Sequence, residues 1–289
     1  MKVAFWSPVR SSMGVTTNMA CMAGIASMSG ASRTILLENH YAASNIADIV
    51  LPVEQNDELR EQANYYGKYG LEYVLKQIYS GRNGIEVIHQ SAVSLLYERL
   101  MYLPQSYIVN REVFNYDFGL VQEELFRCLE ETADYVFVDT ETNCNLSSNT
   151  ILSDADLVVV NLKQDQKILD DFFQDHASLR KKAAYLIASY EKDMELDLRR
   201  ICYQYQISRD RIGVVPLNLE LMSAAAQGRL LQFLSMNYYK TSGRENDYFM
   251  RQIKKAVIML RDNMLRVRRC HHLEPFKPVV KKSANTDHA

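Results

Sequence analysis

Short runs of β-branched and aromatic residues alternate along the chain with longer segments in which apolar residues recur every three or four positions. Runs such as 136–138 and 157–160 are apolar without a break, which is typical of strands that are covered on both faces of a sheet. The alternation predicts βαβ units and a mainly parallel sheet. The strands we expect are 2–7, 34–38, 84–88, 100–103, 135–139, 157–161, 184–189 and 212–216.

Helical periodicity fills the intervals between these runs. A last amphipathic segment, 246–268, carries apolar residues three or four apart, and we expect its stripe to dock on the rest of the chain. No repeat, low-complexity tract or linker divides the sequence. The other expected helices are 15–29, 70–80, 120–132, 165–176, 195–205, 219–227 and 230–236.

The pattern therefore predicts a single α/β domain over residues 1–268. It should be doubly wound, in three layers, with a mainly parallel twisted sheet of about seven to eight strands flanked by helices. Residues 269–289 are basic, contain proline and lack periodicity, so we expect a flexible C-terminal tail.

The composition limits which binding partners and which cellular compartment are expected. Hydrophobic residues make up 47% of the 289 residues, and the net charge is −2, which favours neither a nucleic-acid nor a membrane partner. The five cysteines are scattered and form no CxxC pair, as expected of reduced thiols in the cytoplasm. The sequence predicts no transmembrane segment, because no apolar run is long enough.

The segment 2–26 reads as a strand, a turn and a helix, an order that can present backbone N–H groups to a phosphate. A phosphate-binding P-loop needs GxxxxGK[ST], and on residues 9–16 only Gly14 and Thr16 match this template. Val15 occupies the lysine position and Val9 the first glycine position. Taken alone, the match is equally compatible with a turn glycine and a helix cap.

From residue 2 to about residue 235 the order and spacing of motifs resemble the ParA/MinD family of deviant Walker A, SIMIBI-class P-loop ATPases. The resemblance implies a nucleotide-binding loop, in which Arg10 replaces the signature lysine that reaches the nucleotide of the dimer partner. Arginine can also bind phosphate, in a bidentate manner. The family loop KGGxGKTT lies on Arg10, Ser11, Ser12, Met13, Gly14, Val15, Thr16 and Thr17.

Two downstream segments extend the resemblance. Residues 133–140 are similar to the family strand YDYVIIDTPP, which implies that Asp139 helps to hold Mg²⁺ together with Thr16. Asp139 also follows an apolar strand, at the edge where α/β sheets bind ligands. Residues 212–218 resemble the IPxN segment next to the adenine, which implies base contacts from Pro216, Leu217 and Asn218.

The segment Glu38-Asn39-His40 departs from the family, whose second strand ends in DxD. His40 replaces the carboxylate tied to hydrolysis. An imidazole can act as a base near neutral pH, but the favoured interpretation is that the function is lost. Loss of a P-loop lysine removes a transition-state contact of about 3–4 kcal/mol. We therefore expect a pseudo-ATPase, with binding of ATP and Mg²⁺ left open.

The degenerate loop is similar to the CpaE/TadZ branch of the family, which organises assembly of Tad (Flp) pili. This resemblance implies a homodimeric, cytoplasmic scaffold that positions pilus or secretion machinery at the inner face of the membrane. The alternative is an active partitioning or cell-division ATPase that uses Arg10 and His40. A DNA-binding role would need a basic stripe, which only 251–282 offers, and 270–272 (Cys-His-His) lacks a second pair of metal ligands.

Overall fold

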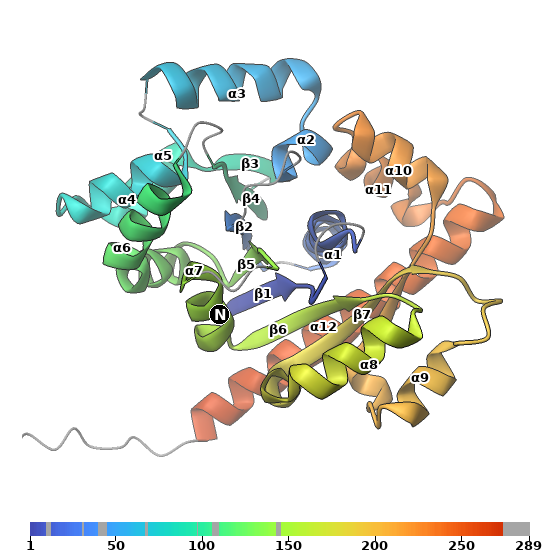
Figure 1. Cartoon of the computed structure of the whole chain (residues 1–289). Coiled ribbons are helices and arrows are strands. Elements are labelled where there is room, and N and C mark those ends of the chain that lie inside the picture. Colours follow the sequence, from blue (N-terminus) through green and yellow to red (C-terminus); the bar gives the residue numbers. More distant parts are fainter. Residues whose placement is uncertain are drawn as a thin grey trace, which may run out of the picture.

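The computed structural model describes residues 1–9, 13–30, 32–39, 45–66, 69–96, 98–105, 110–142 and 146–273. Its centre is an eight-stranded sheet in the order β3-β4-β2-β5-β1-β6-β7-β8 (Figure 1). All neighbouring strands pair in parallel except β3, which is antiparallel to β4. The strands are β1 (Lys2–Trp6), β2 (Thr34–Asn39), β3 (Val93–Leu96), β4 (Leu100–Leu103), β5 (Tyr135–Thr140), β6 (Leu157–Leu162), β7 (Ala183–Tyr190) and β8 (Ile212–Pro216).

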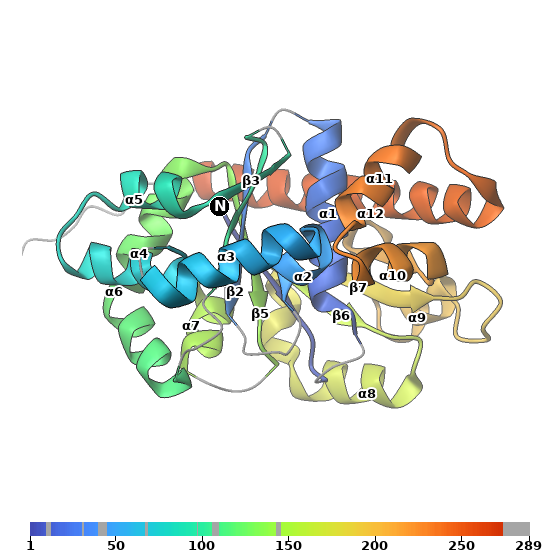
Figure 2. The ribbon, with the colours of Figure 1, turned by 90° about the horizontal axis from the view of Figure 1, so that it is seen from above.

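Helices cover both faces of the sheet, which gives the expected three layers (Figures 1 and 2). One face packs against α1 (Val15–Ser29), α2 (Ile46–Val50), α10 (Leu219–Ala226), α11 (Leu230–Tyr239) and α12 (Gly243–Leu273). The other face packs against α4 (Leu71–Tyr79), α5 (Gly84–Ser91), α6 (Arg111–Thr132), α7 (Leu146–Asp154), α8 (Gln166–Asp175) and α9 (Leu198–Gln204). The remaining helices are α3 (Val53–Tyr66) and the 3-10 helices η1 (Ala177–Lys182) and η2 (Arg209–Arg211).

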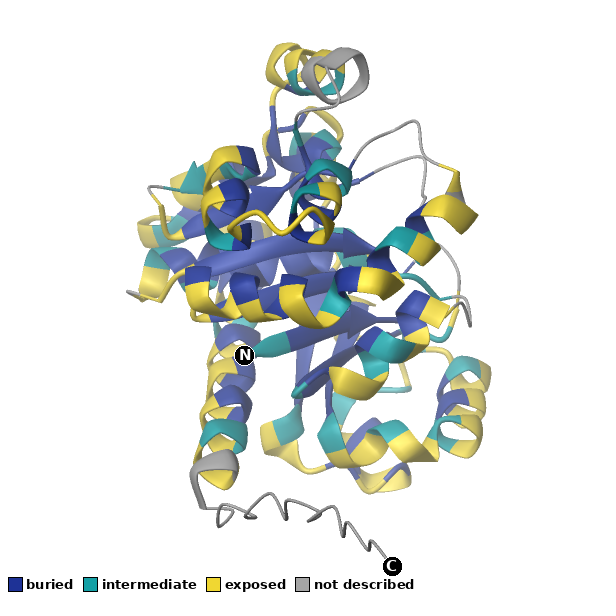
Figure 3. Cartoon of the chain, turned by 90° about the vertical axis from the view of Figure 1, so that its left-hand side faces the viewer, coloured by how far each residue is buried: buried dark blue, intermediate teal, exposed yellow. Residues whose placement is uncertain are grey.

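The central strands are buried because apolar side chains point to both faces. All residues of β5 and β6 are buried, and Figure 3 shows the buried sheet enclosed by helices whose outer sides are exposed. In β1, Val3 and Phe5 join the core under α1, whereas Ala4 and Trp6 join the core on the opposite face. This covering of both faces explains the uninterrupted apolar runs in the sequence.

The fold class and most elements agree with the sequence predictions, but residues 84–88 do not form a strand. They begin helix α5, whose first turn is capped by the Asn83 side chain through the Ile85 N–H. Gly84 lies so close to α6 that a Cβ there would be 2.6 Å from Cys128 Sγ. Packing of α5 on α6 has therefore overridden the strand-like alternation of this short segment.

Other elements also differ from the predictions. Strand β3 and helices α2 and α3 were not expected, and α6 begins at Arg111, well before the expected residue 120. Helix α12 continues through Leu273, past the expected end of the domain at residue 268. The remainder of the expected tail, 274–289, lies outside the described residues.

Helix α12 docks as its periodicity predicts. Phe249, Ile253, Ala256 and Leu260 are buried, and the helix packs on α1 and β8. Within the described part of the chain, none of the helices combines the length and the apolar character needed to cross a bilayer. The four cysteines in that part are free thiols, and Cys144 lies outside it.

Candidate functional site

Four buried polar residues end neighbouring strands at the carboxyl edge of the sheet. Each follows, by two positions, a residue of the core under α1, so all four lie on the α1 side of the sheet. Their exposed fractions are at most 2%. They are Glu38 on β2, Asp139 on β5, Ser7 after β1 and Asn161 on β6.

Gly14 starts α1 directly above this polar row. Its backbone is left-handed, with φ of 59°, and its carbonyl oxygen accepts a hydrogen bond from the Asn18 N–H. A glycine adopts this conformation at no steric cost, so the chain can turn sharply from the loop into the helix. The N–H groups of the first turn of α1 therefore face the carboxyl edge, where they can receive an anion.

Thr16 and Asp139 connect the first turn of α1 to the end of β5. The Thr16 hydroxyl donates a 2.5 Å hydrogen bond to Asp139 Oδ2. Asp139 is 2% exposed, and Thr16 is half-buried. A P-loop hydroxyl and the carboxylate of a neighbouring strand are the two protein groups that hold Mg²⁺ in P-loop NTPases. The structure thus brings together the two residues that the sequence assigned to magnesium.

Asn18 fixes the same helix to the next strand. Its amide donates to the Met13 carbonyl oxygen, at 3.3 Å, and to Asn161 Oδ1, at 2.9 Å. Asn161 in turn donates to the carbonyl oxygens of Trp6 and Val159. These contacts hold the end of the loop over β1 and β6. Asn161 is not among the residues that the sequence assigns to the site, although a polar residue directly after the apolar run 157–160 was the available signal.

Glu38 is completely buried, and its carboxylate is bound within the protein. It accepts hydrogen bonds from the Ile46 N–H and from the Tyr102 hydroxyl, the latter at 2.7 Å. Glu38 therefore joins β2 to α2 and β4. Tyr102 was also missed by sequence analysis, because nothing in the β4 sequence indicates a partner on another strand.

Asn39 belongs to a second network, on the opposite face of the sheet. Its amide donates to the hydroxyls of Ser147 and Ser148 on α7, at 3.2 and 3.3 Å. The Ser147 hydroxyl donates to Asn115 Oδ1 on α6, at 2.8 Å. The end of β2 is thereby linked to the two helices that follow and precede β5.

Several residues that the sequence assigned to the site lie outside the described part of the chain. These are Arg10, Ser11, Ser12 and His40. Of the described loop residues, Met13 is buried, and Thr17 is half-buried like Val15. The Val15 side chain packs on the core under α1, so this position contributes packing rather than a positive charge.

The segment 216–218, which the sequence assigns to contacts with the adenine base, is held mainly by contacts within the protein. Pro216 is the buried end of β8, and Leu217 is 45% exposed. The Asn218 side chain caps α10 by accepting from the Leu221 N–H at 2.7 Å, and it donates to Asn246 at 2.8 Å. Leu217 is therefore the residue of this segment with a side chain available at the surface.

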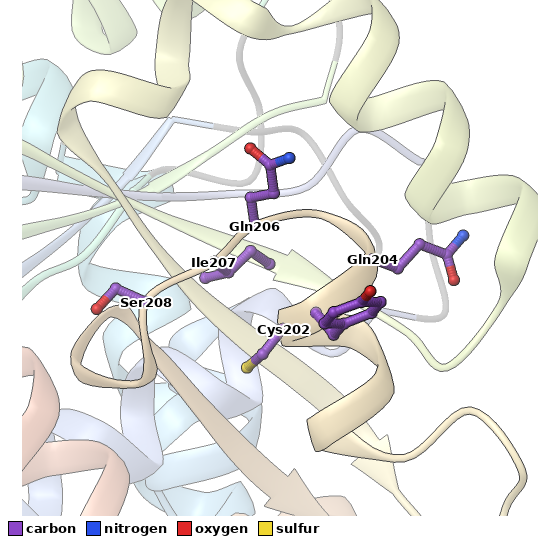
Figure 4. A pocket seen from close by; sticks show the side chains of 6 residues that line it. Cys202, Gln204, Gln206, Ile207 and Ser208 are labelled. Carbon is purple, nitrogen blue, oxygen red and sulfur yellow. The ribbon is translucent and has the colours of Figure 1, made fainter.

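A shallow hollow of about 690 Å³ lies at the end of α9, a helix that packs on the face of the sheet opposite α1 (Figure 4). Figure 4 shows its lining side chains pointing in different directions, and these residues include no lysine or arginine. The described residues also contain no group of three or more His, Cys, Asp or Glu side chains arranged for a metal ion. The first turn of α1 and the end of β5, by contrast, combine a helix N-terminus, the Thr16 hydroxyl and the Asp139 carboxylate.

No protein-family model matches the sequence, and no curated protein matches it either. Solved structures do match the fold. A ParA family ATPase from Chlorobium tepidum TLS has a TM-score of 0.64 at 10% identity, and the MinD cell division ATPase of Pyrococcus furiosus has 0.65 at 13%. Each alignment covers 90% of this chain and 98% of the other.

The septum site-determining protein MinD from Pyrococcus horikoshii OT3, in complex with Mg-ADP, has a TM-score of 0.58 at 13% identity. That alignment likewise covers 90% of this chain and 98% of the other. The chain therefore has the ParA/MinD-like fold of P-loop ATPases, as the resemblance implied.

Proposed function

We propose that this chain binds a magnesium nucleotide at the turn between β1 and α1. Thr16 and Asp139 would bind Mg²⁺, and the N–H groups of the first turn of α1 would bind the phosphates. The observation that carries the proposal is the 2.5 Å hydrogen bond between these two side chains, because it places two oxygen ligands at the start of a helix. Oxygen ligands of this kind suit Mg²⁺.

The similar fold supports the choice of ligand. The Pyrococcus horikoshii MinD that resembles this chain is complexed with Mg-ADP. We propose that this chain also binds an adenine nucleotide, with Arg10, Ser11, Ser12 and Met13 around the phosphates. Leu217 and the neighbouring Pro216 would contact the base, whereas Asn218 would act by shaping this segment through its cap on α10.

Hydrolysis is expected to be slow. Val15 places an apolar side chain where a P-loop lysine would stabilise charge on the phosphates, and loss of one such contact costs about 3–4 kcal/mol in the transition state. The phosphates would pair with the positive N-terminal end of α1, and Mg²⁺ would pair with the Asp139 carboxylate. Bound Mg-ATP would therefore stabilise the site. The nucleotide then acts as a ligand that fixes one conformation of the loop rather than as a substrate.

A fold that binds nucleotide without rapid turnover suits a positioning role. We assign the chain to a homodimeric scaffold in the cytoplasm that locates a Tad/Flp-type pilus or a related secretion system at the inner face of the membrane. Support for this finer assignment comes from the resemblance of the degenerate loop to the CpaE/TadZ branch. Imaging of a fluorescently tagged pilus or secretion protein tests it, because its foci at the membrane should disappear when the gene for this chain is deleted, and foci that persist would contradict the assignment.

The binding site is tested by calorimetric titration with ATP in Mg²⁺ and in EDTA, combined with a phosphate-release assay. We expect saturable binding that requires Mg²⁺ and is lost in Asp139→Ala, with phosphate release at the level of buffer. Absence of binding in Mg²⁺ would overturn the site. If the protein released phosphate rapidly and Asp139→Ala abolished that release, the chain would be an active ATPase. The proposal of a scaffold that does not turn over ATP would then be overturned.

A further inference from the structure

A second cavity lies on the face of the sheet opposite α1. It has a volume of about 410 Å³ and is lined by α7, by the end of α8 and by η1, next to β1. Trp6 is its most buried lining residue, with 4% of its surface exposed. The size falls within the range of about 300–1,000 Å³ that is usual for small-molecule sites.

Trp6 presents an unused hydrogen-bond donor in this cavity. None of the described residues accepts a hydrogen bond from its indole N–H, this N–H is not a fully enclosed atom, and Trp6 lines the cavity. Buried indole N–H groups usually have a partner, because leaving one without a partner costs free energy. A ligand with an acceptor atom would supply that partner.

Aromatic rings form one wall of the cavity. The His176 ring meets Trp6 edge to face, with centroids 5.0 Å apart, and stacks on Phe172 at 5.7 Å. Leu152 and Leu179 add apolar lining. Flat apolar walls of this kind favour a planar ring over a branched aliphatic group, because a planar ring contacts Trp6 and His176 together.

Lys182 is the charged side chain in the lining of the cavity. Lys182 lines it, with Nζ donating to the carbonyl oxygens of Ser153 and Ala155 at 2.6 and 3.2 Å, and the lining residues include no aspartate or glutamate. Burial lowers the pKa of Lys182, while the carboxylates of Asp154 and Asp156 oppose that change. A carboxylate in the cavity would offset the desolvation of the ammonium group.

We propose that this cavity is a binding site for a planar aromatic carboxylate. The ring would lie against Trp6 and His176, an acceptor atom would receive the indole N–H, and the carboxylate would face Lys182. The site is distinct from the polar row, which lies on the α1 side of the sheet. It is nevertheless bounded by segments next to that row, since Trp6 precedes Ser7 and Thr142 follows Asp139 by three positions.

Trp6 is the single tryptophan of the chain, so its indole N–H gives one resonance in a proton–nitrogen correlation spectrum. Titration of the labelled protein with 4-hydroxybenzoate should shift this resonance to saturation. The cation 4-hydroxybenzylamine, which has the same ring, should leave it in place, and cyclohexanecarboxylate should bind at least about tenfold more weakly. No shift with the aromatic acid, or equal shifts with the acid and the amine, would overturn the proposal.

A pair of neighbouring substitutions on α7 controls for indirect effects. Asn149 lines the cavity, and the adjacent Thr150 does not. Asn149→Tyr should fill the cavity and weaken binding by at least about tenfold, whereas Thr150→Tyr should change it by less than about twofold. Equal loss in both variants would overturn the assignment. The proposal would also be overturned if Mg-ADP displaced the aromatic acid and reversed the shift of the Trp6 resonance, because the cavity would then belong to the nucleotide site.

Discussion

Thr16 and Asp139 are 123 residues apart in the chain, yet their side chains share a 2.5 Å hydrogen bond. The contact depends on two local structures. The left-handed turn at Gly14 starts α1 over the sheet, and β5 brings Asp139 to the carboxyl edge between β2 and β1. Because both groups are oxygen donors, the pair can exchange its mutual hydrogen bond for a shared Mg²⁺ ion.

The first prediction concerns the Thr16 hydroxyl. Thr16→Ala should weaken binding of Mg-ADP by at least about tenfold, because one of the two protein oxygens for Mg²⁺ is lost. Thr150→Ala is the matched control, because Thr150 lies on α7 on the opposite face of the sheet, and its effect should stay below about twofold. Calorimetric titration at a fixed Mg²⁺ concentration measures both. Equal affinities for the Thr16→Ala and unmodified proteins would show that Thr16 does not bind the metal.

The second prediction restores the missing cation. Val15 is half-buried beside the first turn of α1, so a lysine there can extend from the core surface toward the phosphates. Val15→Lys should tighten ATP binding by about 1.5–3 kcal/mol, the usual contribution of a hydrogen bond to a charged group. Val15→Met controls for side-chain length without the charge. If the two variants bind ATP equally, the side chain at position 15 does not reach the phosphates of the bound ATP.

The third prediction tests the buried carboxylate at the end of β2. Glu38 is fully buried and accepts a hydrogen bond from the Tyr102 hydroxyl, so Tyr102→Phe leaves one carboxylate oxygen without that donor. The free energy of unfolding should fall by about 1–3 kcal/mol. Tyr79→Phe is the control, because Tyr79 is 70% exposed, and it should have little effect. Urea denaturation measures both, and a fall no larger than that of Tyr79→Phe would contradict a structural role for the Tyr102 hydroxyl.

The sequence predicted the parts of the fold in which local pattern and tertiary environment agree. Helix α1 and strands β4 and β8 have the expected bounds, because their apolar residues are buried in the way the pattern requires. Residues 84–88 were assigned wrongly, since a short alternating segment can form either element and close packing of Gly84 on α6 decides between them.

Parts of the candidate site could be placed from the sequence where one residue type carries a local signal. Asp139 ends an apolar strand, and Gly14 precedes a helix, so both were identified from sequence. Asn161 and Tyr102 were missed because their importance depends on which strands are neighbours, and strand order is not written in any local segment. The capping role of Asn218 was missed for a related reason: its partner Asn246 is 28 positions away.

The fourth prediction concerns the turn between α10 and α11. Gly228 has φ of +68°, and a Cβ there would lie 1.8 Å from the Leu51 carbonyl oxygen. Gly228→Ala therefore combines a strained backbone with a clash against rigid main chain, and it should lower the free energy of unfolding by about 3 kcal/mol or more. Gly243→Ala separates the two causes, because Gly243 has φ of +82° with nothing within 4 Å of a Cβ.

Gly243→Ala should cost only the backbone term, about 1–2 kcal/mol. Thermal and urea denaturation of the two variants measure the difference. Equal losses would mean that the loop after α2 moves away from Gly228 at no cost, which would contradict tight packing of the α10–α11 turn on the end of α2.

The fifth prediction compares two glycines inside helices. Gly119 lies within α6, and a Cβ there would have nothing within 4 Å, so Gly119→Ala should stabilise the protein by about 0.5–1 kcal/mol through lower backbone entropy in the unfolded chain. Gly24 lies within α1, where a Cβ would be 3.0 Å from Leu231 Cδ2 and 3.1 Å from Leu234 Cδ1.

Gly24→Ala gains the same helix propensity, but it must displace the Leu231 and Leu234 side chains at the contact between α1 and α11. Overpacking of a well-packed core costs about 1–3 kcal/mol, so the gain should be cancelled or reversed. Urea denaturation should therefore place Gly24→Ala at least about 1 kcal/mol below Gly119→Ala in the free energy of unfolding. If the two variants are equally stabilised, α1 and α11 are not in close contact at Gly24.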